Sequence, residues 1–157
     1  IHSFESTLTS LLILALYMPM LADTGGNTGS QSASVVVRAL ALGQLRPRDF
    51  LRVIYKELKI SMGIAVVLGI LSYLKVVFIS RGMEIPVGYS LSRIALVIGL
   101  ALGIQVVSST LIGAALPLAA ARIKQDPAVV ASPALTTIVD ITGLLIYFTT
   151  AKLLLGV

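Results

Sequence analysis

Four long apolar stretches constrain the fold of this chain more than any other feature. They cover residues 8–45, 60–79, 94–121 and 134–157, and a helix needs about 20 largely apolar residues to cross the hydrocarbon core of a bilayer. Only 12% of the residues are charged and 57% are hydrophobic, whereas a soluble domain has about 25% charged residues. The sequence therefore predicts an all-α, polytopic membrane helix bundle with four spans, and it excludes most soluble enzymes.

The first apolar stretch is interrupted by a polar, glycine-rich segment. As one straight helix it would overshoot a bilayer, and residues 24–29 place three glycines and an amide inside it. We expect two helical pieces around a break, with Asp23 as an ion ligand or as the cap of the second piece. A hinge or a close crossing of two helices is the alternative. The predicted lining of the break, which offers oxygen ligands to an ion, consists of Gly25, Gly26, Asn27 and Gly29.

The connections between the spans predict how the chain is oriented in the membrane. Residues 46–59 have the spacing of a short amphipathic helix at the membrane surface, and residues 38–59 carry six of the basic side chains. The connection 122–133 adds Arg122 and Lys124. By the positive-inside rule, connections 38–59 and 122–133 are predicted to be cytoplasmic, with loop 80–89 outside the cell (inner) membrane. The net charge of +5 is thus a topology signal, and no nucleic-acid partner is expected.

Asp140 is the residue most indicative of function. It lies in an apolar span with no Lys or Arg within a helical turn, and a charge at that depth costs a few kcal/mol unless it faces a partner or a water-filled cavity. Helical spacing places Thr136 and Tyr147 on the same side, as a stripe that would line a pore. The alternative is a neutral Asp140 that is hydrogen-bonded to a neighbouring hydroxyl.

Two further segments contain residues with possible roles in transport. Asp126 and Pro133 flank the start of the last span and are predicted to form its rigid cytoplasmic mouth, with Asp126 either attracting cations or starting a helix. The third span contains Gln105, Pro117 and the pair Gly99 and Gly103, for which helix packing is the simplest interpretation.

The available side-chain chemistry favours a hard cation as the ligand. The chain has no Cys, and its single His is His2, so zinc and copper sites are not expected. Carboxylate, hydroxyl, amide and carbonyl oxygens suit Mg²⁺, which keeps its water tightly and would be recognised as the hydrated ion. No nucleophile and base pair is expected, so an enzyme is not predicted. A two-fold dimer would bring two Asp140 carboxylates to a shared pore, with a divalent cation or a proton between them.

Several motifs, in order and spacing, resemble the MgtE family of magnesium channels. They are Pro19, residues 24–32, residues 38–41, Leu116 with Pro117, residues 126–128 and residues 139–147. The resemblance covers nearly the whole chain. It implies a homodimer with five membrane helices per subunit, a pore along the dimer axis, and regulation by cytosolic N and CBS domains. Residues 1–157 would then be helices two to five of the cation-transport domain, and we expect an upstream span and the regulatory domains to be absent from this chain.

The resemblance also implies roles for individual residues. Asp140 corresponds to the pore acid that recognises hydrated Mg²⁺, with Gly26, Gly29 and Thr136 near the same ion. Val129 and Ser132 stand where the family narrows its cytoplasmic gate.

We therefore expect a membrane domain whose homodimer conducts Mg²⁺ through a pore at the dimer interface, and the sequence leaves the selectivity against other divalent cations open. The first alternative is a proton- or Na⁺-coupled carrier, in which Asp140 takes up the coupling ion. The second is a membrane scaffold without transport, with the glycines used for packing. The expected partners are a second copy of the chain, membrane lipids and the transported cation.

Overall fold

The computed structural model of the chain describes residues 2–85, 87–130 and 133–156. Its elements are α1 (His2–Ala41), the short 3₁₀ helix η1 (Pro47–Asp49), α2 (Phe50–Ile79), α3 (Leu91–Arg122), the one-turn α4 (Pro127–Val130) and α5 (Pro133–Leu155). The described residues contain no strand, so the predicted all-α class is confirmed.

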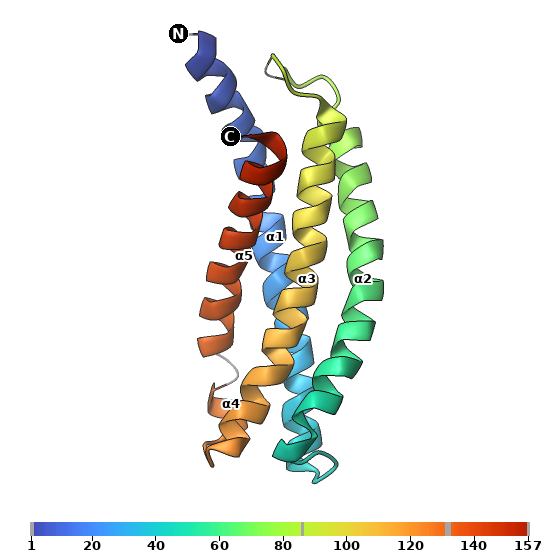
Figure 1. Cartoon of the computed structure of the whole chain (residues 1–157), viewed down its shortest axis with the longest axis vertical. Helices are drawn as coiled ribbons and strands as arrows, with labels where there is room; N and C mark the ends of the chain where they lie inside the picture. The colour runs from blue at the N-terminus through green and yellow to red at the C-terminus, as the bar shows by residue number, and fades with distance from the viewer. Residues whose placement is uncertain (1, 86, 131–132, 157) are drawn as a thin grey trace.

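The four long helices form an elongated bundle in which each runs antiparallel to the one before it (Figure 1). Both ends of the chain lie at the same end of the bundle as the loop that joins α2 to α3. The connection from α1 to α2 and the short helix α4 lie at the opposite end. The two basic connections that the sequence assigned to one side of the membrane therefore share one end of the bundle.

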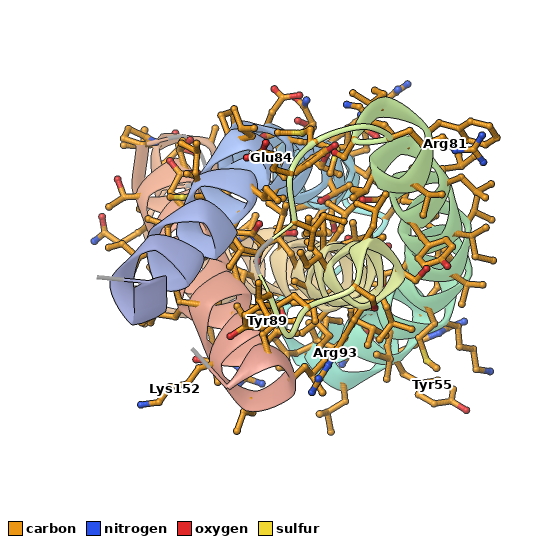
Figure 2. All side chains as sticks on the ribbon, turned by 90° about the horizontal axis from the view of Figure 1, so that it is seen from above. Tyr55, Arg81, Glu84, Tyr89, Arg93 and Lys152 are labelled. Atoms are coloured by element: carbon orange, nitrogen blue, oxygen red, sulfur yellow. The ribbon has the colours of Figure 1, made fainter. Side chains whose placement is uncertain are left out.

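Helix α3 forms the centre of the bundle and packs against α1, α2 and α5. Seen from above, it lies between the other three long helices (Figure 2). Three segments, Pro47–Ile79, Leu91–Arg122 and Pro133–Leu155, are long and apolar enough to cross a membrane, and the 40-residue α1 is the fourth long helix. The predicted integral membrane helix bundle is confirmed.

The predicted break in the first span is wrong. Helix α1 continues through the glycine-rich segment. Within it, two threonine hydroxyls donate to carbonyls of their own helix, Thr24 to Met20 (2.7 Å) and Thr28 to Thr24 (3.0 Å). Asp23 lies inside this helix and is exposed, so it caps nothing. Gly25 and Gly29 pack against neighbouring helices, which is the close helix crossing that the sequence left open as an alternative.

The predicted separate surface helix at residues 46–59 is also wrong. A helix does begin at Pro47, where the Arg46 N–H donates to Asp49 (2.9 Å), but the following residues are the first turns of α2. No glycine or proline separates them from the apolar stretch, so nothing ends the helix there. Val53 packs in the bundle, and Ser32 of α1 donates to the Glu57 carboxylate (2.9 Å). The segment is therefore attached to the bundle through both α1 and α3.

Small residues bring α2 and α3 close together, as the sequence indicated for Gly99 and Gly103. A Cβ added to Gly99 would lie 2.8 Å from the Gly69 carbonyl oxygen of α2, and one added to Gly103 would lie 3.4 Å from the carbonyl of Ala65. Backbones approach this closely only where side chains are absent or small. The packing interpretation of these two glycines is confirmed.

Candidate metal-ion site

Asp140 lies on α5, about two turns after its first residue. Its side chain is half-buried, between the buried Val139 and the exposed Ile141. The nearby threonines Thr137 and Thr142 donate to carbonyls of their own helix, at 3.2 and 2.6 Å. Within the part of the chain that the structure describes, no side chain is hydrogen-bonded or ion-paired to the Asp140 carboxylate. The carboxylate is therefore available to a group from outside this chain.

The glycine-rich segment of α1 lies at the same level of the bundle as Asp140. Gly29 faces α3 and α5: a Cβ added to it would lie 3.1 Å from the Ser109 carbonyl oxygen and 3.3 Å from a methyl of Val139. Val139 and Leu135 of α5 pack with Ala33 in one apolar cluster. The structure therefore brings together the two segments that the sequence singled out separately.

Gln105 of α3 joins these two segments, and its importance was missed from the sequence. The residue is fully buried, and its side-chain Nε2 donates to the carbonyl of Val139 on α5 (3.1 Å). The amide lies between Gly25 of α1 and Gly143 of α5, and a Cβ on either glycine would overlap it. The signal available in the sequence was the one amide of a span whose polar residues cluster in its middle, at Gln105 and residues 108–110.

One face of α1 is polar and exposed at this level. Its members are spaced by three or four residues, which places them on one side of a helix. This polar face lies between two apolar segments of α1. Contact of the face with lipid would therefore be energetically unfavourable. The exposed polar residues are Asp23, Asn27, Ser30, Gln31 and Ser34. On α5, Thr136 and Thr137 are exposed beside Asp140.

The two glycines that were predicted as ion ligands differ in their surroundings. Gly26 is half-buried, and a Cβ added to it would meet no atom within 4 Å. The Gly29 carbonyl oxygen faces α3, where a Cβ on Gly113 would overlap it. In a continuous helix these carbonyls accept from the N–H four residues later. Coordination through Gly26 and Gly29 stays a prediction.

The residues predicted for the cytoplasmic mouth lie at the end of the bundle that carries the basic connections. The Asp126 side chain accepts a hydrogen bond from the Ala128 N–H (2.9 Å) and caps α4, which agrees with the helix-start role. Val129 is exposed on α4, and the exposed Pro133 begins α5. Ser132 lies outside the described residues, so its gate role stays a prediction, as do those of Val129, Pro133 and Asp126.

The described residues contain no group of three or more His, Cys, Asp or Glu side chains that could hold a metal ion. The site within one chain therefore has the Asp140 carboxylate on α5, with Asp23, hydroxyls and the amides of Asn27 and Gln31 on the exposed face of α1. Direct chelation of a dehydrated divalent cation needs six or more oxygen ligands. This donor set suits an ion that keeps most of its water, as the sequence led us to expect.

Comparison with known proteins gives a consistent result. Residues 18–150 match the MgtE family, described as divalent cation transporter. The chain is 39% identical over 155 residues to the magnesium transporter MgtE of Thermus thermophilus and 32% identical over 148 residues to that of Bacillus subtilis. These alignments cover 99% and 94% of this chain but 32% and 31% of the relatives. A third relative, the magnesium transporter MgtE of Enterococcus faecalis, is 32% identical over 153 residues. The chain therefore spans about a third of the length of these relatives.

Proposed function

Because the chain belongs to the MgtE family of divalent cation transporters, we propose that it is the membrane domain through which Mg²⁺ passes. The observation that carries the proposal is the Asp140 carboxylate, which lies half-buried on a membrane helix and has no partner among the described residues. Acidic groups at that depth persist where they face an ion path or a partner. The relative from Thermus thermophilus is named a magnesium transporter, and Mg²⁺ is a hard cation that carboxylate oxygens attract.

The ion is recognised with its water shell. Mg²⁺ loses water reluctantly and usually keeps several water ligands when it binds to a protein. The Asp140 carboxylate, with hydroxyls and amides at the same level, offers acceptors for hydrogen bonds from those waters. Such binding is weak enough to let the ion leave again, which conduction requires.

The path lies between two copies of the chain. The polar face of α1, which includes Asp23, Asn27 and Gln31, is exposed in a single copy, and a second copy related by a two-fold axis would cover it with the same surface. The axis would then bring two Asp140 carboxylates toward one another, and their repulsion is relieved when a divalent cation lies between them. A homodimer with a shared pore accounts for both the polar face and the available acid.

The basic end of the bundle faces the cytoplasm. The connections at that end contain Arg46, Arg48, Arg122 and Lys124, and basic connections are retained on the cytoplasmic side of the inner membrane. Helix α4, with Val129, and the start of α5 at Pro133 then lie at the inner mouth of the path. This is where a gate would act on the ion after it has passed Asp140.

The test is Mg²⁺ influx into proteoliposomes that contain the full-length protein, measured without a proton or Na⁺ gradient. Wild-type protein is expected to pass Mg²⁺, and Asp140→Asn to reduce the influx by about tenfold or more, because the amide keeps the shape but removes the charge that attracts the cation. The variant should remain monodisperse. Wild-type influx through Asp140→Asn would contradict the assignment. Influx that appears only with an imposed proton or Na⁺ gradient would instead establish a coupled carrier.

A further inference from the structure

The Gln105 side chain links α3 to the backbone of α5 next to the proposed ion ligand. Its Nε2 donates to the carbonyl of Val139 (3.1 Å), and Val139 is the residue before Asp140. Successive residues of a helix point about 100° apart, so the buried Val139 and the half-buried Asp140 have different surroundings. A small rotation of α5 about its axis would therefore carry the Asp140 carboxylate into or out of the bundle.

Two glycines make room for this amide. A Cβ on Gly25 of α1 or on Gly143 of α5 would overlap the Gln105 Nε2 atom. Three helices thus meet around one side chain. Because the amide is enclosed on two sides and bonded on a third, it restricts how far α5 can turn relative to α1 and α3.

Packing alone does not explain a glutamine at this position. The Gln105 Oε1 atom is buried and has no hydrogen-bond partner among the described residues, and a buried acceptor without a partner is unfavourable. An apolar side chain of the same length would fill the space between Gly25 and Gly143 without that cost. The amide is therefore expected to have a role that an apolar group cannot fill.

We propose that Gln105 is a positioning residue that holds α5 at the rotation at which Asp140 faces the ion path. The inference rests on the proposed function, because it assigns to Asp140 the recognition of the cation. Gln105 itself is fully buried and acts through the Val139 carbonyl. Removal of the Gln105 amide should lower the affinity for the ion. Its effect on the amount of folded protein should be smaller.

The experiment measures Mg²⁺ influx against Mg²⁺ concentration for four proteins. Gln105→Met is nearly isosteric and removes the hydrogen bond, while Gly143→Ala displaces the amide with Gln105 still present. Thr110→Val is the matched control, because the Thr110 hydroxyl is also buried on α3 but donates only to Val106 of its own helix (2.7 Å). We expect the half-saturating Mg²⁺ concentration to rise about tenfold in the first two variants, as for a misplaced binding group, and to change less than about twofold in the control.

A coupled substitution separates positioning from simple packing. In a Gln105→Ala background there is no amide to displace, so adding Gly143→Ala should cause no further rise in the half-saturating concentration. If Gly143→Ala has the same effect in both backgrounds, the glycine serves helix packing and the inference is overturned. Unchanged half-saturation in Gln105→Met would overturn it as well. If influx still depends on Asp140, either of these results overturns the inference and leaves the proposed function unaffected. Absence of influx through the wild-type protein would refute the proposed function itself.

Discussion

Helix α3 meets its neighbours along two seams that share small residues but differ in polarity. The apolar seam, between α2 and α3, has Gly69 against Gly99 and opens into a groove of about 690 Å³ with largely apolar walls, such as Met62, Ile70 and Ile104. The polar seam, where α1 and α5 meet α3, encloses the Gln105 amide. Close approach of helices alone therefore does not mark a functional site in this fold. What distinguishes the polar seam is the polar group that the glycines enclose.

A second contact supports the distinction. In the polar seam the hydroxyls of Thr28 on α1 and Ser109 on α3 lie 3.1 Å apart and share a hydrogen bond. In the apolar seam the contact at Gly99 is with backbone and with the Cβ of Tyr73. The exposed side of α2 next to it carries Val66, Val67 and Ile70, which suit contact with lipid.

The largest effect is expected in the polar seam, from Gly113→Ala. Its Cβ would overlap the backbone of Gly29 on α1, and backbone atoms cannot move aside as a side chain can. We expect a loss of about 3 kcal/mol or more in stability, measured as the thermal midpoint at which monodisperse protein is lost. Gly63→Ala is the control, because a Cβ there meets no atom within 4 Å and alanine favours the helix. Equal midpoints for both variants would contradict the close α1–α3 contact.

A smaller effect is expected from Gly99→Ala in the apolar seam. The added Cβ would lie 2.8 Å from the Gly69 carbonyl oxygen, so α2 must shift slightly, at a cost of about 1–2 kcal/mol. Because no ion ligand lies in this seam, the half-saturating Mg²⁺ concentration for influx should stay at the wild-type value. A change in that concentration as large as the one produced by Gln105→Met would show that the two seams do not differ in function.

The sequence predicted the four apolar spans and which connections share one end of the bundle, but not the exact bounds of the helices. The apolar stretches predicted the spans, and the basic connections were found at one end of the bundle. The expected break at residues 24–29 did not form, because a glycine permits several backbone conformations and packing decides among them. The partners of these glycines, Gln105 and Gly113 of α3, are about 80 residues away in the chain and cannot be read from local spacing.

The candidate site was predicted in its components and not in its arrangement. Asp140 could be identified because an acid in an apolar span is unusual. Gln105 was visible as a polar residue, but its contact with the Val139 carbonyl depends on how α3 and α5 are turned toward one another. Asp126 starts a helix, which is one of the two roles that the sequence allowed for it, and this contact is local, with Ala128.

The most direct measurement of the difference between the seams is the reactivity of single cysteines with a membrane-impermeant thiol reagent. The chain has no Cys, so Asn27→Cys on the polar face of α1 and Val66→Cys on the exposed apolar side of α2 each introduce a single thiol within it. We predict that Asn27→Cys reacts, that Mg²⁺ slows its reaction, and that Val66→Cys does not react because lipid covers it. Two results would contradict an ion path on the α1 and α5 side of the bundle. One is an Asn27→Cys that does not react, and the other is a Val66→Cys that reacts as fast as Asn27→Cys and is protected equally by Mg²⁺.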